Sequence, residues 1–311
     1  MAFEKIKNEM KKEIVGMDDI IRDLFVCLIS KGHILLEGVP GLAKTTLAKS
    51  FSKCMGLYFS RVQGTPDLIP SDITGGEIYR MQTGEFQYIP GPLFANIVLV
   101  DEINRMSPKT QSALLEAMEE NSISVGGKTY TLPKPFIVIA TQNPIEFEGT
   151  YSLPAAQLDR FMMKLNMDYL DEDDELKVLY LKKSGDNNNI EQINTVLDKK
   201  TLENIFNTVK NIYVSKVILK YIRDIIVATR NDKRIVLGAS TRAGIQLLKV
   251  AKANAYLDDR TYVIPDDVKN NVFKVLSHRM ILDYEEETPA EEILADILDK
   301  IEVPKGEFRW E

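Results

Sequence analysis

The chain has 311 residues, of which 44% are hydrophobic and 27% are charged, the profile of an ordinary soluble globular protein. A length of this order favours two domains over a single core. The formal net charge of −7 counts against a general nucleic-acid coat, so we expect no nucleic-acid partner. No segment approaches the roughly 20 apolar residues of a membrane span, and the first residues lack the apolar region of a signal peptide. We therefore expect a cytoplasmic protein without membrane insertion.

The first part of the chain shows two amphipathic helical patterns, over residues 3–13 and 18–31. Val15 and Gly16 lie between them. The cysteines and histidines have no metal-binding or redox spacing, and we interpret them as reduced or structural residues: Cys27, Cys54, His33 and His278.

Residues 33–55, HILLEGVPGLAKTTLAKSFSKCM, predict a strand, a phosphate-binding loop and a helix in succession. The loop matches the spacing G-x-x-x-x-G-K-[ST] at every position but one, where Ala43 replaces the second glycine. We expect the alanine to be tolerated because its φ should stay negative. Glycines let backbone N–H groups point at phosphate oxygens, and the following helix N-terminus adds to that field. Lys44 would contact the β- and γ-phosphates, and the Thr45 hydroxyl would bind Mg²⁺.

The alternative to a phosphate-binding loop is a tight turn whose lysine is merely solvated. The apolar run Ile34–Leu36 before the loop and the apolar face of the helix after it favour nucleotide binding. The predicted contacts of the loop with the nucleotide are Gly38, Val39, Pro40, Gly41, Leu42, Ala43, Lys44, Thr45 and Thr46.

Residues 57–62 resemble a second strand, and the segment 63–93 after it is rich in proline and glycine. Within that segment, residues 77–81 and 86–89 alternate around a turn at Thr83-Gly84. The simplest account is a small hairpin inserted beside the nucleotide site.

Two further apolar strands deliver polar groups to the same predicted crevice. The strand in residues 96–102, NIVLVDE, ends in Asp101 and Glu102, and the strand over 136–140 is followed by Asn143. Asp101 would hold Mg²⁺ through water, Glu102 would orient and polarise the attacking water, and Asn143 would help to position it. The alternatives are a helix cap for the acidic pair and a turn former for Asn143.

Between these strands, residues 107–120 predict a helix with Ser107 as its N-cap. Residues 123–125 and 128–131 flank Gly126-Gly127 and predict a second hairpin. A last strand over residues 161–167 gives five strands in all.

From Tyr169 onward the pattern is helical, interrupted by the polar joint SGDNNN at residues 184–189, and we place a domain boundary near Leu170. Helices are predicted at about 215–229, 241–257 and 265–276. Arg242 lies in the first turn of a helix capped by Ser240, where it opposes the helix dipole. Arg242 is therefore either an anion clamp or a partner in a surface salt bridge. The same two alternatives exist for Arg160, for which the sequence alone favours the salt bridge.

The assembled motifs resemble those of the MoxR-type AAA+ ATPases, in the helix-2-insert clade. The resemblance covers roughly residues 14–280 and rests on seven segments in one order: GVPGLAKT, LIPSDITG, TGEFQYIPGPLFANIVLVDEIN, KTQSALLEAMEE, ATQNPIEFEGTY, LPAAQLDRF and GASTRA. The sequence departs from the family pattern at Met17, where glutamine is common, and at Ala155-Ala156, where glutamate-alanine is common.

The resemblance implies an α/β fold: a P-loop AAA+ core over residues 1–170 with a five-stranded, mostly parallel sheet, then a smaller all-α lid over 171–311. Residues 63–93 would be the helix-2 insert, and residues 121–132 the hairpin before sensor 1. The implied roles are Walker A for Lys44 and Thr45, Walker B for Asp101 and Glu102, sensor 1 for Asn143, sensor 2 for Arg242, arginine finger for Arg160, and the loop bordering the adenine for Val15 and Gly16.

An arginine finger acts on the nucleotide of a neighbouring subunit, so the resemblance also implies a homo-oligomeric ring, with a hexamer expected. It further implies hydrolysis of ATP with Mg²⁺ to drive chaperone-like remodelling, assembly or metal-centre maturation of a partner with a von Willebrand factor A domain. Two alternatives stay open: a nucleic-acid motor, against which the acidity counts, and a weakly hydrolysing nucleotide switch, against which the complete water-activating set counts.

Overall fold

The computed structural model describes residues 2–82, 84–143, 150–183 and 193–306, and their contacts group them into two compact units. We call the first the sheet unit; it comprises Met1–Asp23, His33–Leu153 and Leu165–Lys199. The second, the helical unit, comprises Leu24–Gly32, Pro154–Lys164 and Lys200–Glu311. The domain boundary that the sequence places near Leu170 stays a prediction.

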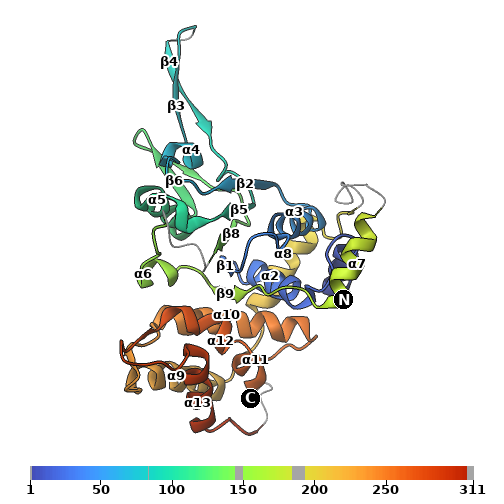
Figure 1. Cartoon of the computed structure of the whole chain (residues 1–311), viewed down its shortest axis with the longest axis vertical. Helices are drawn as coiled ribbons and strands as arrows, with labels where there is room; N and C mark the ends of the chain where they lie inside the picture. Colours follow the sequence, from blue (N-terminus) through green and yellow to red (C-terminus); the bar gives the residue numbers. More distant parts are fainter. Residues whose placement is uncertain (1, 83, 144–149, 184–192, 307–311) are drawn as a thin grey trace. The chain divides into compact units, whose positions relative to one another are not determined.

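A five-stranded sheet with the strand order β2-β5-β8-β1-β9 forms the centre of the sheet unit (Figure 1). Its strands are β1 (Ile34–Glu37), β2 (Phe59–Gln63), β5 (Ile97–Asp101), β8 (Ile137–Gln142) and β9 (Met163–Asn166). The first two residues of β9 belong to the helical unit. The pairs β1·β8, β2·β5 and β5·β8 are parallel, which confirms the predicted α/β fold and its five strands. Every residue of β5 is buried, as expected for a parallel strand covered on both faces.

The predicted helices of the sheet unit are also present. They are α1 (Ala2–Met10), α2 (Asp18–Ile29), α3 (Lys44–Cys54), α5 (Pro108–Glu120) and α7 (Glu172–Lys182), with a 3₁₀ turn η1 (Ile103–Arg105) after β5. The last residues of α2, from Leu24, belong to the helical unit. Ser107 caps α5, because its side chain accepts a hydrogen bond from the Thr110 amide. Among the described residues, no helix is both long enough and apolar enough to span a bilayer.

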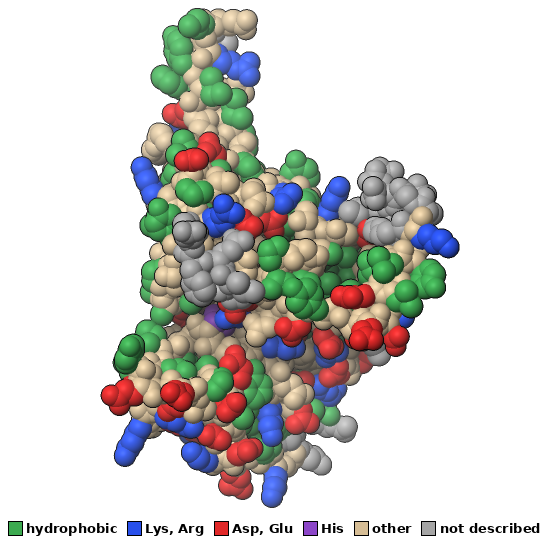
Figure 2. Space-filling view, viewed as in Figure 1, with side chains coloured by type: hydrophobic (Ala, Val, Ile, Leu, Met, Phe, Trp, Pro, Cys, Tyr) green, Lys and Arg blue, Asp and Glu red, His purple; other side chains and the backbone are tan. Residues whose placement is uncertain are grey.

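Both predicted hairpins are confirmed. β3 (Gly75–Arg80) pairs with β4 (Glu85–Pro90) after a short helix α4 (Pro70–Thr74), and β6 (Ser122–Val125) pairs with β7 (Lys128–Thr131). The rings of Tyr88 on β4 and Tyr130 on β7 stack with centroids 4.0 Å apart, which ties the two hairpins together. Beyond this contact β3 and β4 project away from the sheet, and Figure 2 shows hydrophobic side chains along them. Thr83 of the predicted turn lies outside the described residues.

The helical unit contains α6 (Ala155–Leu158), α8 (Lys199–Lys210), α9 (Lys216–Asn231), α10 (Thr241–Leu257), α11 (Pro265–Lys269), α12 (Val272–Leu276), a 3₁₀ turn η3 (Ser277–Arg279) and α13 (Ala290–Lys300). It also holds a two-stranded sheet, β10 (Ile235–Leu237) with β11 (Ile281–Leu282), which the helical pattern did not predict. The polar joint at residues 184–189 lies outside the described residues.

The single helix predicted over residues 265–276 is wrong, because the chain forms two short helices that break at Asn270 and Asn271. The buried side chain of Asn271 donates a hydrogen bond to the Asp267 carbonyl at 2.9 Å. Such a local bond competes with the regular backbone ladder, which explains the break.

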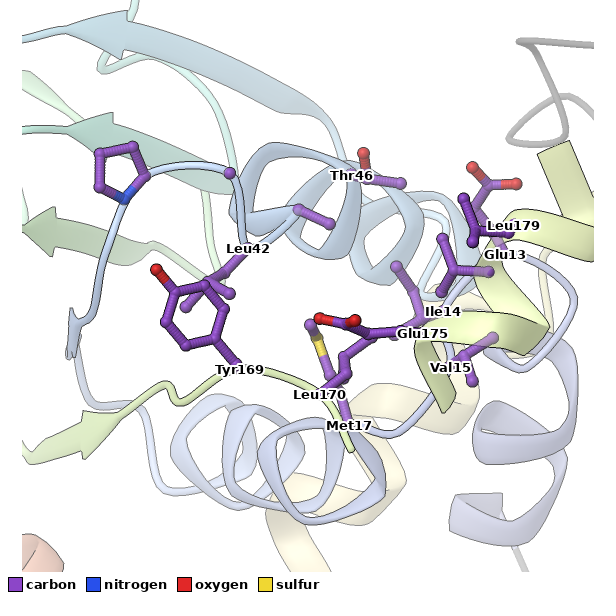
Figure 3. Close-up of a pocket in the computed structure, with 14 residues that line it drawn as sticks. Glu13, Ile14, Val15, Met17, Leu42, Thr46, Tyr169, Leu170, Glu175 and Leu179 are labelled. Carbon is purple, nitrogen blue, oxygen red and sulfur yellow. The ribbon is translucent and has the colours of Figure 1, made fainter. Parts of the chain in front are cut away.

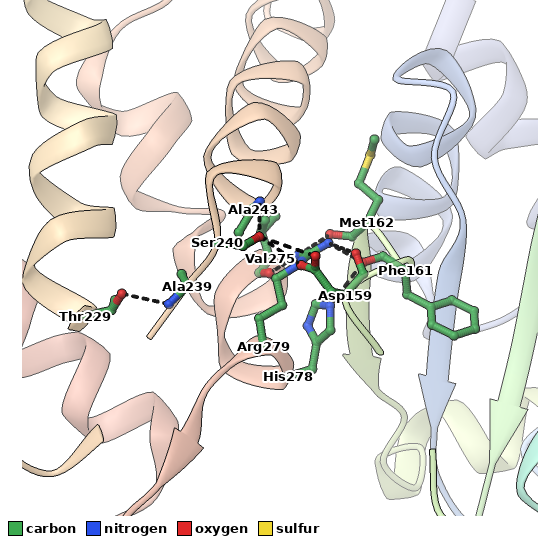
Figure 4. Close-up of polar contacts among 10 residues, drawn as sticks. All are labelled: Asp159, Phe161, Met162, Thr229, Ala239, Ser240, Ala243, Val275, His278 and Arg279. Atoms are coloured by element: carbon green, nitrogen blue, oxygen red, sulfur yellow. Dashed lines mark hydrogen bonds and ion pairs between the residues drawn. The ribbon is translucent and has the colours of Figure 1, made fainter. Parts of the chain in front are cut away.

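A buried guanidinium, that of Arg279, organises one part of the helical unit (Figure 4). Its Nε donates to Asp159 Oδ1 at 2.7 Å, and its two terminal nitrogens donate to four backbone carbonyls. Those carbonyls belong to Asp159, Phe161, Met162 and Val275. A buried charge is tolerated only when it is paired and its donors are satisfied, and here every nitrogen has a partner.

Replacing Arg279 by methionine should lower the free energy of unfolding by about 3 to 5 kcal/mol, because Asp159 and the four carbonyls lose their donor. Arg223→Met is the matched control, since the Arg223–Asp224 pair is exposed, with side-chain exposures of 62% and 46%, and should cost less than about 1 kcal/mol. Urea denaturation followed by circular dichroism measures both. Equal, small shifts for the two variants would contradict the central role of Arg279.

Candidate nucleotide-binding site

The register of the parallel strands gathers polar residues at one edge of the sheet. Gln63 at the end of β2 pairs with Asp101 at the end of β5, and Glu37 at the end of β1 pairs with Gln142 at the end of β8. Because Val100 of β5 lies opposite Ala140 of β8, the residues after them, Asp101 and Thr141, are neighbours too. The carboxyl ends of parallel strands form the usual ligand crevice of such a fold.

The predicted phosphate loop connects β1 to α3 at this edge. The Gly38 amide donates to the Gln142 carbonyl at 3.3 Å, and a Cβ at position 38 would lie 2.5 Å from the Met167 carbonyl oxygen, so only glycine fits. Gly41 has φ of +91°, a conformation that a side chain would strain. The loop therefore has the sharp curvature that brings backbone amides round an anion.

The backbone conformation of Ala43 differs from the one expected from the sequence. Its φ is +52°, in the left-handed region, and not negative as the sequence analysis assumed. A non-glycine residue in this conformation costs about 1 kcal/mol or more. Ala43 is the N-cap of α3, and the turn it makes directs the helix start, from Lys44 onward, at the crevice. The surrounding loop must offset this cost.

Lys44 and its neighbours line a cavity of about 360 Å³ at the sheet edge. Its walls are Pro40, Gly41, Leu42, Ala43, Lys44, Thr45, Thr46, Arg61, Gln63, Asp101, Glu102, Thr141, Gln142 and Asn143. The Lys44 ammonium donates to the Gly38 carbonyl, within the loop itself. Burial lowers the pKa of Lys44 from its ordinary value, while Asp101 and Glu102 oppose that shift. A phosphate would supply the opposite charge that this half-buried ammonium needs.

Asp101 is buried and lies at the centre of the cavity's polar contacts, with 8% of its surface exposed. The Thr45 hydroxyl lies 3.4 Å from its Oδ2 atom, and Arg61 Nε donates to the same oxygen at 2.7 Å. The Thr141 hydroxyl lies 3.4 Å from Oδ1. A carboxylate and a hydroxyl therefore face the phosphate loop side by side.

Glu102 follows with φ of +56°, a left-handed conformation that turns the chain sharply at the end of β5. Its amide donates to the Thr141 hydroxyl at 2.9 Å. Its Oε2 atom accepts from Gln63 Nε2 and from Arg105 Nη1, both at 3.1 Å. The side chain is thus held in the cavity by neutral and cationic donors.

A second cavity, of about 490 Å³, shares the loop residues Pro40–Ala43 and Thr46 with the first. Figure 3 shows the three segments that supply its side chains: the turn after α1, the phosphate loop, and α7 with the residues before it. The other lining residues are Glu13, Ile14, Val15, Met17, Tyr169, Leu170, Glu175, Val178 and Leu179. Gly16, with φ of +72°, turns the chain between Val15 and Met17. Most of these side chains are apolar, which suits the flat face of a purine beside a phosphate site.

The structure thus brings together, within the sheet unit, residues 40–46 of the predicted loop, Val15, Asp101, Glu102 and Asn143, whereas Gly38 and Val39 line neither cavity. Arg160 and Arg242 belong instead to the helical unit. Arg242 is exposed in the first turn of α10, whose N-cap is Ser240, as predicted. Five further residues that line the cavities were not predicted from the sequence: Arg61, Gln63, Thr141, Gln142 and Tyr169. Arg61 and Gln63 could have been predicted, because residues two apart in a strand lie on the same face of the sheet and these two polar residues stand at the end of a strand.

The fold and the two joined cavities define a P-loop nucleotide-binding protein, and comparison with known proteins agrees. The model of the ATPase family associated with various cellular activities (AAA) matches residues 33–163, and the AAA lid domain model matches residues 227–300. A crystal structure from Cytophaga hutchinsonii, described as a candidate ATPase, is similar with a TM-score of 0.91 and 43% identity, covering 98% of this chain and 95% of that one.

Relatives that match over most of their length show the family to which the chain belongs. YeaC of Bacillus subtilis, an uncharacterised protein, is 46% identical, with 96% of this chain and 94% of that protein covered. Chaperone MoxR1 of Mycobacterium tuberculosis is 41% identical, with 98% and 83% covered. The chain belongs to the MoxR-type AAA+ ATPases, and it is an ATPase with an AAA core followed by a lid domain.

Proposed function

We propose that this ATPase uses Mg²⁺-dependent ATP hydrolysis to remodel a partner protein. The observation that carries the proposal is the single polar cavity in which the phosphate loop, Lys44, Thr45, Asp101 and Glu102 meet. The apolar cavity that shares the loop would take the adenine, against Val15 and the turn at Gly16. The nucleotide would therefore span both cavities within the sheet unit.

In the proposed mechanism, Lys44 and the amides of the loop bind the β- and γ-phosphates. Glu102 accepts a hydrogen bond from the attacking water, orients it towards the γ-phosphorus and polarises it. Asn143, at the wall of the same cavity, helps to fix the water. Arg242 from the same chain and Arg160 from a neighbouring subunit would neutralise the charge that develops in the transition state.

The residues at the loop fit a magnesium ion. Mg²⁺ prefers oxygen ligands and usually keeps one or two protein groups together with substrate phosphates and water. Thr45 and Asp101 supply such oxygens on one side of the cavity, 3.4 Å apart. In the described part of the chain no cluster of three or more His, Cys, Asp or Glu residues could hold a metal alone, so phosphate oxygens would complete the coordination. The ion would supply charge neutralisation on the phosphates.

The partner is proposed from the relatives and from the family resemblance. MoxR1 is named a chaperone, which supports a chaperone-like role for this chain. We propose a partner with a von Willebrand factor A domain, whose assembly or metal centre the ATPase matures in the cytoplasm. We also propose a homo-oligomeric ring, a hexamer, in which residues 63–93 are the helix-2 insert and Arg160 reaches the adjacent nucleotide.

Glu102→Gln should retain ATP binding while hydrolysis falls by about two to four orders of magnitude, because the water loses its base but the phosphate loop is intact. Lys44→Ala should weaken binding itself. Calorimetric nucleotide affinity and steady-state turnover for both variants separate the two roles. Normal turnover in Glu102→Gln would refute the assignment of the base.

Arg160→Ala should abolish hydrolysis in the assembled ring, by about 10³-fold or more, if it acts as an arginine finger. Mixing these chains one to one with Glu102→Gln chains should restore about a quarter of the activity, since that share of interfaces pairs an intact base with an intact finger. Arg242→Ala should instead alter nucleotide affinity even in a monomer.

The matched control for the mixing experiment is Lys44→Ala with Glu102→Gln. Both residues act in their own chain's cavity, so no interface in that mixture has a complete site and activity should stay absent. Restoration in the control, or its absence in the Arg160 mixture, would overturn the proposed action across subunits.

The partner assignment has its own test. Glu102→Gln loaded with ATP should retain a purified von Willebrand factor A domain protein from the same organism, whereas the double variant Lys44→Ala/Glu102→Gln should not, because it cannot bind nucleotide. Size-exclusion chromatography measures the complex. Absence of ATP-dependent retention would contradict the partner assignment. A several-fold stimulation of ATPase turnover by DNA at physiological salt would favour the nucleic-acid motor instead.

A further inference from the structure

The guanidinium of Arg61 donates a hydrogen bond to the carboxylate oxygen of Asp101 that faces the phosphate loop. Its Nε donates to Oδ2 at 2.7 Å, and this is the oxygen that lies 3.4 Å from the Thr45 hydroxyl. Its Nη2 donates to Gln63 Oε1 at 2.9 Å, and Gln63 in turn donates to Glu102. Arg61 therefore belongs to the network that holds both carboxylates.

Two properties of this ion pair point to a role beyond the fold. The Arg61 side chain is 49% exposed whereas that of Asp101 is 11% exposed, so the arginine can leave the pair into solvent while the carboxylate cannot. A carboxylate left uncompensated beside the phosphate loop would repel a nucleotide. The guanidinium removes that repulsion at the oxygen offered to a metal.

We propose that Arg61 is the counter-ion of Asp101 in the metal-free site and that it competes with magnesium for the Oδ2 atom. The arginine allows nucleotide to bind without metal, and it raises the magnesium concentration needed to load the site. When metal arrives, the guanidinium moves off the carboxylate along its exposed side. This inference rests on the proposed Mg²⁺-dependent function of the same cavity.

Arg105 offers a matched comparison. It pairs with the other carboxylate, Glu102, at 3.1 Å, and its side chain is similarly exposed at 42%. Removing it takes the same charge from the same neighbourhood but leaves the Asp101 pair in place. Any effect of general charge loss should therefore be common to Arg61→Gln and Arg105→Gln, whereas competition with metal should belong to Arg61 alone.

The test is the affinity for ADP, measured by calorimetry in excess EDTA and in saturating Mg²⁺. Arg61→Gln should weaken ADP binding about tenfold in EDTA and by less than about twofold in Mg²⁺, and the Mg²⁺ concentration for half-maximal tightening should fall. Arg105→Gln should leave the ratio of the two affinities within about twofold of the parent. In an Asp101→Asn background, Arg61→Gln should no longer matter in EDTA, because no carboxylate charge is left to compensate.

Equal weakening of Arg61→Gln in both media would overturn the proposal in favour of a direct nucleotide contact, and no weakening in EDTA would overturn it outright. Thermal unfolding of each variant identifies any loss of folded protein. A failure of the proposed function would give a different result. The unsubstituted protein would then bind ADP no more tightly in Mg²⁺ than in EDTA, or would not bind ADP.

Discussion

The in-register ends of the parallel strands are the constraint on which the rest of the site depends. Backbone pairing places Gln63 opposite Asp101, and Asp101 beside Thr141, before any side chain makes a contact. The phosphate loop starts where β1 ends at the same edge, and its first amide bonds to the Gln142 carbonyl. A shift of one residue in any strand would turn these side chains to the other face of the sheet. Strand register therefore determines which polar side chains meet at this edge of the sheet.

This arrangement concentrates negative charge where an anionic substrate must bind. Asp101 and Glu102 are adjacent in sequence, and each accepts from an arginine, Arg61 or Arg105. Lys44 is a further cation that lines the same cavity, and burial already disfavours its charged form. Cations that can exchange partners suit such a site, since bound phosphates, and the magnesium ion proposed with them, would bring new charges that change the contacts of the empty site.

Local patterns predicted much of the fold and the loop, because a buried parallel strand, a glycine turn and a capped helix each leave a signature within a few residues. The hairpins around Gly84 and at Gly126-Gly127 and the cap at Ser107 are of this kind. Features that depend on distant pairings were missed. The partnership of Arg61 with Asp101 exists only through the β2·β5 register, and the positive φ of Ala43 only through the closure of the loop. The break at Asn271 depends on a hydrogen bond of a buried side chain, which the periodicity of the sequence does not indicate.

The two cavities of the site are linked through the loop they share. Pro40–Ala43 and Thr46 form a wall of both, so the left-handed turns at Gly41 and Ala43 shape the two cavities together. The cavity of about 490 Å³ also takes side chains from the turn after α1 and from α7, which are far apart in sequence (Figure 3). A bound nucleotide would add contacts to all three segments at once, and binding that adds contacts to one conformation shifts the population towards it. In the proposed binding mode, the strained turn at Ala43 is thus the element through which phosphate contacts and base contacts would influence one another.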